Sequence, residues 1–322
     1  MPGVGETFSN PFTESRVAKH PVTTLDYLTE YAFAREALIA GVFVATAAAL
    51  LSTVVVLKRL AFVGQGISHS AFAGIGLAVL IGLSGIWSEV LILASCFAAA
   101  MVIGSMGRVR GGGDDTAIGI VLAGAMGLGF LLLSLRQPLR RYEWYEQWLA
   151  AMDAPAPIGL ESILFGSLMT VGPEGVGLSI VLAGVIVAAL WWWRRPMLLY
   201  VFDETVARSA GVPVARLRLL LLLMLAGVVA VGMKLAGVVL ISALLVIPGA
   251  IGLQFCRRLG PTLLVSWAAA MAGVTGGIVL SLELEQFKLT PGATIVIVLI
   301  ALYALAAWFG RYTSGRGQSP HG

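Results

Sequence analysis

The stretch Gly64–Ala78 reads GQGISHSAFAGIGLA and opens an apolar run that continues to Leu83. It contains His69, and the other two histidines of the chain lie in its polar terminal segments. Gln65 precedes His69 by four residues, so in a helix both side chains share one face. A titratable ring is expensive to place in a hydrophobic segment, which makes His69 either a functional residue or a hydrogen-bonded packing residue. The four glycines of the stretch allow neighbouring backbones to approach closely.

The rest of the chain is as apolar as this stretch. Of its 322 residues, 58% are hydrophobic and 12% are charged, and the mean hydropathy is +0.93. Soluble domains carry about 25% charged residues. The composition therefore predicts an all-α polytopic membrane protein. Its net charge of +4 is then a sign of membrane topology, and we expect no nucleic-acid partner.

A transmembrane helix needs about 20 apolar residues, and we expect eight to nine such helices. Residues 35–310 form the predicted transmembrane domain, preceded by a polar extension (1–34) and followed by a disordered tail (311–322). The candidate spans are 37–57, 67–84, 87–107, 117–135, 175–193, 217–233, 236–255, 261–282 and 292–309.

The basic residues predict the orientation of these spans. Lys and Arg collect on the cytoplasmic side of a membrane, close to the span ends. With Lys58 and Arg59 placed inside, thirteen of the 21 basic residues fall inside and eight outside. We therefore expect a multi-pass protein of the cytoplasmic membrane, with its N-terminus outside and its C-terminus inside. The segment 136–161, rich in Trp and Tyr, then lies outside, where an interfacial helix is favoured over a ligand platform.

A short amphipathic helix is predicted between the fifth and sixth spans, at Phe202–Val212 (FDETVARSAGV). Asp203 suits its N-cap and Glu204 its first turn, and Gly211 followed by Pro213 provides a C-terminal stop. Such a capped helix on the cytoplasmic side is either a docking element for a partner or a plain connector.

In their order and spacing, several segments resemble the permease subunits of ABC importers for zinc, manganese and iron. The resemblance covers roughly residues 35–310. The segments that carry it are GQGISHSAFAGIGLA, Asp114–Ser134, FDETVARSAGV with Gly237–Phe255, and Leu289–Gly292.

The resemblance implies three partners: a second permease copy or paralogue, a cytoplasmic ATP-binding subunit, and an extracytoplasmic metal-binding protein. It also implies that the helix near 203–213 docks on the ATPase, through Asp203, Glu204, Arg208 and Gly211. The sequence contains no phosphate-binding loop of the GxxxxGKS/T type. We therefore expect ATP to be hydrolysed by the partner. This chain is expected to be no enzyme and to bind no cofactor beyond the transported divalent metal.

The resemblance makes His69 and Gln65 candidate ligands of a transient metal site. The family usually has Asp where this chain has Gln65, and an Asp/His pair suits Zn²⁺ or Mn²⁺. An amide is a weaker ligand, so the site is weak, is completed by a distant acid, or is no longer a ligand site. Glu283 and Glu285, at the outer end of the eighth span, either attract cations to an outer mouth or form a solvated loop with Lys288.

Pro248 and Gly249 interrupt the seventh predicted span. A proline inside a span removes one backbone hydrogen bond and kinks the helix. Irregular backbone at membrane depth is tolerated where it faces protein or a water-filled path. The pair is therefore either a packing kink or a hinge that lines the pathway.

Other functions remain as alternatives. A permease for a metal chelate would share the same overall plan. A secondary transporter working alone is less favoured, because ion-coupled carriers usually need titratable groups at mid-membrane. An intramembrane metalloenzyme would need a motif such as HExxH, which the sequence lacks.

Overall fold

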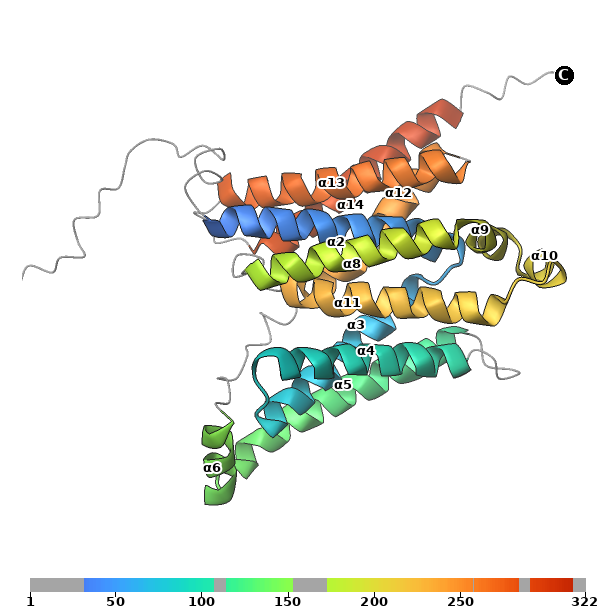
Figure 1. Ribbon diagram of the computed structural model, residues 1–322. Coiled ribbons are helices and arrows are strands. Elements are labelled where there is room, and N and C mark those ends of the chain that lie inside the picture. The colour runs from blue at the N-terminus through green and yellow to red at the C-terminus, as the bar shows by residue number, and fades with distance from the viewer. Residues whose placement is uncertain (1–31, 107–113, 153–172, 257, 284–289, 315–322) are drawn as a thin grey trace, which may run out of the picture.

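The computed structural model describes residues 32–106, 114–152, 173–256, 258–283 and 290–314, whose regular structure is entirely helical (Figure 1). Nine segments within these ranges are long and apolar enough to cross a membrane, which confirms the predicted fold class. The helices are α2 (Ala32–Leu57), α3 (Ala61–Ile81), α4 (Gly85–Met106), α5 (Asp114–Leu139), α6 (Glu143–Ala151), α8 (Pro173–Trp192), α9 (Arg194–Phe202), α10 (Glu204–Ser209), α11 (Val214–Leu244), α12 (Ile247–Phe255), α13 (Leu259–Glu283) and α14 (Pro291–Ser314).

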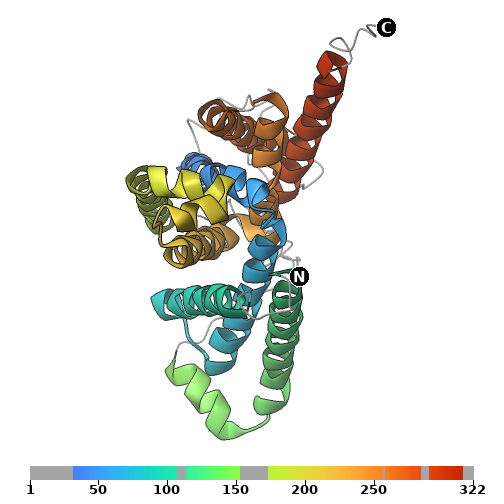
Figure 2. The same ribbon diagram turned by 90° about the vertical axis from the view of Figure 1, so that its right-hand side faces the viewer.

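The long helices run between two ends of the molecule (Figure 1). The short helices α9 and α10 lie at one end, which we call the α10 end. Helix α6 lies at the opposite end, the α6 end, where it runs across the ends of the long helices. Helix α3 connects the two groups of helices seen in Figure 2, with α4 and α5 on one side and α2 and α11 on the other.

Helices α2, α3 and α11 make up most of the buried core, which includes Leu51, Ile67 and Leu221. Over their most apolar 18 residues, α2 and α3 are each 67% buried, whereas α5 and α8 are each 17% buried. The apolar side chains of these outer helices are therefore free to face lipid, as expected for spans at the periphery of a membrane protein.

Helix α3 begins at Ala61, six residues before the predicted span, so the whole stretch Gly64–Ala78 is helical. Its glycines lie at tight contacts. A Cβ on Gly74 would lie 2.5 Å from Ser95 Oγ of α4, and one on Gly76 would lie 2.8 Å from the carbonyl oxygen of Gly129 on α5. The close backbone approach expected from these glycines is confirmed.

The seventh span differs from the predicted kinked helix. The chain leaves the helical conformation at Gly237 (φ 82°, ψ 162°), a region open essentially only to glycine. The following helical stretch ends at Leu244, and α12 starts afresh at Ile247 with Pro248 in its first turn. Proline is tolerated there because the first-turn N–H groups have no partner within the helix. Pro248 therefore starts a helix, and the interruption precedes it.

The predicted boundaries of the terminal segments differ from the structure in two places, and the first is α2, which begins at Ala32, inside the predicted extension 1–34. Helix α14 continues to Ser314, so residues 311–314 of the predicted disordered tail are helical. Residues 1–31 and 315–322 lie outside the described residues, and so does Glu285. Helix α6 is the helix expected within residues 136–161.

Candidate ion site and docking helix

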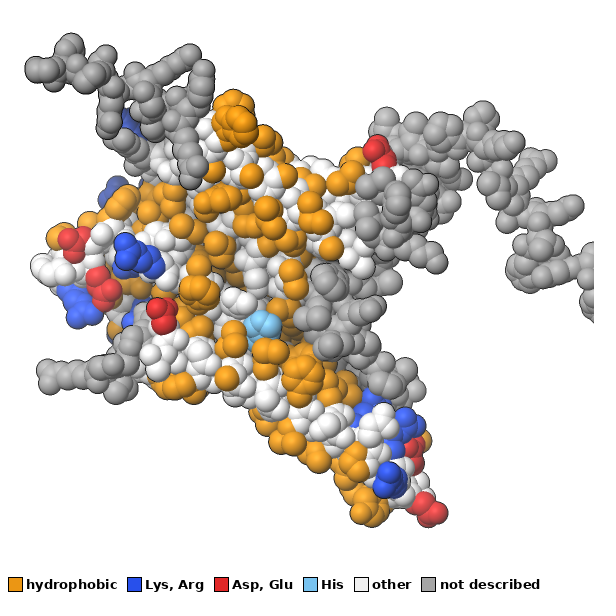
Figure 3. All heavy atoms as spheres, turned by 180° about the vertical axis from the view of Figure 1, so that it is seen from behind, with side chains coloured by type: hydrophobic (Ala, Val, Ile, Leu, Met, Phe, Trp, Pro, Cys, Tyr) orange, Lys and Arg blue, Asp and Glu red, His pale blue; other side chains and the backbone are white. Residues whose placement is uncertain are grey.

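Gln65 and His69 lie one turn apart on α3, where Gln65 is exposed and His69 is half-buried. His69 is the single histidine of the described chain, and Figure 3 shows its pale-blue side chain on a face covered mainly by hydrophobic side chains. Polar side chains of this kind are unfavourable against hydrocarbon and usually face a bundle interior, a partner or water. This face of α3 is therefore a candidate site for an ion or for a second chain.

Behind this face, α3 packs against the interrupted seventh span. The Ser68 hydroxyl donates to the carbonyl oxygen of Gln65 at 2.9 Å and lies 3.3 Å from Ser242 Oγ of α11. A Cβ on Gly64 would lie 3.1 Å from Leu245 Cδ1, so Gly64 adjoins the interruption itself. The side of α3 opposite the polar pair thus packs against the end of α11, just before the interruption.

The described part of the chain shows no cluster of acids beside the polar pair. Glu283 is exposed at the last residue of α13, and Glu285 falls outside the described residues. Within the described ranges, no three or more His, Cys, Asp and Glu side chains gather closely enough to hold a metal ion. His69 and Gln65 therefore remain the candidate ligand pair expected from the sequence, one turn apart on α3.

Pro248 and Gly249 are buried and anchored on α2. The Gly249 N–H donates to Ser52 Oγ at 2.8 Å. A Cβ on Gly249 would lie 2.5 Å from the Ser52 carbonyl oxygen, so any larger residue would push the two backbones apart. The start of α12 is thus fixed against α2, while Val246, just before it, departs from helical backbone angles (φ −121°, ψ −52°).

Both capping predictions for the short helix between the fifth and sixth spans are confirmed. Asp203 is the N-cap of α10, and its Oδ1 accepts hydrogen bonds from the N–H groups of Thr205 (2.8 Å) and Val206 (3.0 Å). At the other end, Gly211 (φ 76°) and the next residue donate back to Arg208 and Ala207, which is a Schellman motif. Helix α10 is shorter than the predicted 202–212 because Asp203, in an extended conformation, separates it from α9.

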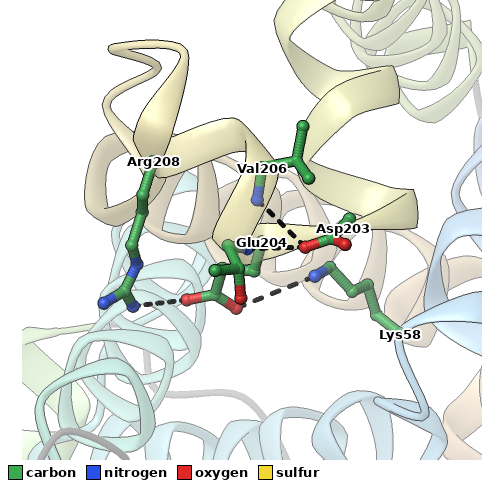
Figure 4. Close-up of polar contacts among 6 residues, drawn as sticks. Lys58, Asp203, Glu204, Val206 and Arg208 are labelled. Atoms are coloured by element: carbon green, nitrogen blue, oxygen red, sulfur yellow. Dashed lines mark hydrogen bonds and ion pairs between the residues drawn. The ribbon is translucent and has the colours of Figure 1, made fainter.

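Glu204 links α10 to the segment that leads into α3 (Figure 4). Its carboxylate accepts a 2.6 Å hydrogen bond from Arg208 and lies 3.8 Å from Lys58 Nζ. The Lys58 ammonium also lies 3.9 Å from the ring centroid of Tyr200 on α9. Burial lowers the pKa of Lys58, and the Glu204 carboxylate opposes this shift. Lys58 directly follows α2 and lies three residues before α3, so the pair joins α10 to the connection between these two helices.

Sequence reasoning missed this role of Lys58, because no local pattern pairs residues so far apart in the chain. It also missed the attachment of α6 to the other end of α3. There the Tyr145 hydroxyl donates to the Leu80 carbonyl at 2.6 Å, and the Trp148 indole N–H donates to the Ile81 carbonyl at 2.8 Å. These carbonyls belong to the last turn of α3 and have no partner within a helix. The aromatic residues of 136–161 were the only feature of the sequence that could have pointed to this attachment of α6.

The last residue of α9 and the outward side of α10 offer a contact surface at the end of the molecule. Phe202 and Val206 are apolar and exposed, at 66% and 51%, and the Arg208 side chain is also exposed. Exposed apolar residues rimmed by charge are typical of protein interaction sites.

Within the described residues, nine segments long and apolar enough to cross a membrane define a multi-pass membrane protein. The chain belongs to the ABC 3 transport family, whose family model matches residues 30–310. This confirms the resemblance seen in the sequence.

Similar proteins cover nearly the whole permease region. The manganese transport system membrane protein MntC of Halalkalibacterium halodurans is 28% identical over 284 residues, covering 88% of this chain and 89% of MntC. The chelated iron transport system membrane protein YfeD of Yersinia pestis is 27% identical over 276 residues, covering 86% and 85%. A solved chain of PsaBC from Streptococcus pneumoniae in complex with Fab shares the fold, with a TM-score of 0.71, 23% identity, and coverage of 88% of this chain and 93% of that chain.

Proposed function

We propose that this chain is the membrane-spanning permease subunit of an ABC importer that carries a divalent transition metal, namely zinc, manganese or iron, across the cytoplasmic membrane. The observation that carries the proposal is the pairing of Gln65 and His69 on an exposed face of α3, in a chain of the ABC 3 transport family. The names of the relatives MntC and YfeD, which refer to manganese and chelated iron, support a metal cargo.

A second copy of the chain, or a paralogue, completes the site in this proposal. Zinc usually takes about four ligands, and His and oxygen ligands also suit manganese and iron. One chain presents Gln65 and His69 on a face that lipid would cover unfavourably. Two such faces opposed to each other would provide two imidazoles and two amides and would remove all four side chains from lipid.

The orientation follows from the basic residues, with the α10 end in the cytoplasm and the N-terminus outside. The last residue of α13, Glu283, then lies toward the outside, together with Glu285 of the segment that follows. Their negative charge would raise the local cation concentration where an extracytoplasmic binding protein delivers its metal.

Energy enters through a separate ATP-binding subunit docked at the α10 end. The apolar side chains of Phe202 and Val206 suit a groove on that subunit, while the caps at Asp203 and Gly211 keep α10 rigid. The Glu204–Lys58 contact then carries movement of α10 toward α3 and its polar pair.

The interruption before Pro248 serves as the hinge of the pathway. Gly249 holds the start of α12 on α2, so rearrangement of the span is concentrated in the two residues before it, where Leu245 packs on Gly64 of α3. A bend there would shift α3 from behind and so move its polar pair.

The direct test is uptake by vesicles that contain the assembled permease and ATPase, supplied with binding protein, ATP and each of Zn²⁺, Mn²⁺ and Fe²⁺. We expect His69→Ala to lower uptake at least about tenfold, the equivalent of one lost strong ligand contact, while the subunits still assemble. Ser134→Ala on the exposed side of α5 is the matched control and should transport normally. Unchanged uptake by His69→Ala would remove His69 from the pathway, and uptake without the ATPase would point to a transporter working alone.

A permease for a metal chelate is the second candidate. Two observations favour it: the amide of Gln65 stands where the family pattern has a carboxylate, and the relative YfeD is named for chelated iron. An amide can donate and accept hydrogen bonds to an organic ligand as well as bind a metal. Uptake of a chelate that exceeds uptake of the free ion, and that survives His69→Ala, would support this candidate.

A further inference from the structure

A cavity of about 290 Å³ lies at the α10 end, on helices that do not include α3. Helices α8 and α13 both pack on α2, and the cavity occupies the space between α9 and the start of α13 over the last turns of α2. It is open to the outside on one side. Six of its lining residues, from α2, α9 and α13, are Leu50, Val54, Arg194, Met197, Val201 and Leu263.

The lining is almost wholly apolar. Its uncharged polar side chain, Thr53, donates to Ser266 Oγ of α13 at 3.1 Å and is therefore already paired within the protein. Arg194 is the single charged side chain that lines it. An apolar space of this size is a poor site for water and a good one for hydrocarbon, since water needs several polar partners.

Neighbouring aromatic residues place Arg194 at the level of the lipid headgroups. Trp191, Trp192 and Trp193 are consecutive and exposed at the end of α8, as in the aromatic belts found at membrane–water boundaries. The Arg194 guanidinium follows them and lies 5.6 Å from the ring centroid of Trp191. From this level the cavity extends along α2 from Val54 to Leu50, toward the middle of the bilayer.

We propose that the cavity binds one acyl chain of an anionic phospholipid, with the phosphate of the headgroup at Arg194. The planar guanidinium matches phosphate oxygens with two parallel hydrogen bonds, and the apolar lining matches the chain. Under the proposed orientation this leaflet is the cytoplasmic one, whose anionic lipids attract basic residues at the membrane surface.

The lipid would also hold the docking helix in place. Met197 and Val201 line the cavity from α9, and α9 runs directly into the Asp203 cap of α10. An occupied cavity therefore fixes α9 against α2 and α13. This consequence for coupling rests on the proposed function, whereas the binding of lipid does not.

Photo-crosslinking tests the site without metal or ATP, so its outcome is independent of transport. The assembled transporter is placed in phosphatidylcholine vesicles that contain a trace of phosphatidylglycerol with a photoactivatable acyl chain. We expect crosslinks in α2, α9 and α13 that excess phosphatidylglycerol removes and excess phosphatidylcholine does not.

Gly260 provides a way to narrow the cavity. It lines the space, and a Cβ there would meet no atom within 4 Å, so Gly260→Leu adds apolar volume at the cavity wall and improves helix propensity. We expect labelling to fall at least about tenfold, as expected when a lipid loses its binding site. Gly184→Leu on α8 is the matched control, because it is equally open and lies outside the cavity.

Arg194→Gln tests the headgroup contact. We expect the preference for phosphatidylglycerol over phosphatidylcholine to drop about tenfold, the usual effect of losing a charge-assisted pair. Arg195→Gln, which removes the same charge from a residue that does not line the cavity, should keep the preference. The proposal would be overturned if both lipids labelled the protein equally and if Gly260→Leu did not change that labelling. Crosslinks from a cavity residue to a second protein chain would overturn it too, since they would show a protein interface.

Discussion

The two faces of the 21-residue helix α3 differ in how closely they are packed. One face is closed by shape, because Gly74 and Gly76 let the backbones of α4 and α5 come so near that a single added carbon would clash. The other face carries Gln65 and His69 and leaves them exposed or half-exposed on an apolar surface. The comparison teaches that tight packing on one face fixes the position of α3. The side chains of the other face are therefore not needed to hold the helix in place. Its two ends, at Lys58 and at Ile81, are held by a few polar contacts.

The largest effect is expected on the closed face. Gly74→Leu would force its side chain into Ser95 and the backbone of Ile92, so we expect a loss of about 3 kcal/mol or more in stability from overpacking. Gly127→Leu on α5 is the control, because a Cβ there meets nothing within 4 Å. It should stabilise slightly through helix propensity. Thermal unfolding of the detergent-solubilised protein measures both, and equal midpoints would mean that the glycine face is not closed.

The next largest effect is expected on the polar face, where a substitution should change the affinity for metal ions. Gln65→Asp restores a carboxylate one turn from His69 and should tighten Mn²⁺ or Zn²⁺ binding about tenfold, or about 1.4 kcal/mol. Stability should change little, because the side chain at position 65 is exposed. Titration of the assembled transporter with Mn²⁺ gives the affinity, and Gln65→Asn serves as the control of similar size without the charge. If Asp and Asn bind alike, the polar face is not a metal site.

The features predictable from sequence are those that depend on neighbours in the chain. The caps at Asp203 and Gly211 and the packing glycines of α3 follow from local rules and were found where expected. The interruption before α12 was predicted at Pro248, because proline is the strongest local breaker. The structure places the break just before it, where packing on Ser52 and α3 decides the backbone.

Contacts between distant segments could not be predicted in this way. The Lys58–Glu204 pair and the hydrogen bonds from α6 to the end of α3 depend on how whole helices pack. No spacing rule connects such residues, and their types are common at helix ends. The polar pair Gln65 and His69 could be noticed in the sequence because such residues stand out in an apolar helix, and its role as a ligand pair stays a prediction.

A smaller effect is expected at the α6 end of α3. Tyr145→Phe keeps the ring and removes the hydroxyl that donates to the Leu80 carbonyl, so we expect a loss of about 1 kcal/mol in stability. Hydrogen exchange should rise in the last turn of α3 and stay unchanged in the glycine-packed middle. Tyr142→Phe, at the exposed neighbour, should alter neither. Faster exchange along the whole helix would show that α6, and not the glycine face, holds α3.

The smallest change in stability is expected at the α10 end. Lys58→Met removes an ion pair at 3.8 Å whose acid is exposed, and such pairs contribute about 0–1 kcal/mol. Burial lowers the pKa of Lys58 below its ordinary value of 10.5. The folded protein therefore releases this proton before the unfolded chain does, and stability rises as the pH increases from the lowered pKa toward 10.5. Lys58→Met should abolish that rise.

The metal uptake per ATP hydrolysed should change far more in Lys58→Met than the stability does. If Glu204 passes the movement of α10 to α3 through Lys58, then Lys58→Met lowers metal uptake per ATP hydrolysed several-fold, by analogy with linkage energies of about 1 kcal/mol. The exchanged pair Lys58→Glu with Glu204→Lys should recover part of the uptake, which a loss of packing alone would not permit. If Lys58→Met takes up as much metal per ATP as the unmodified protein, this end of α3 moves independently of α10.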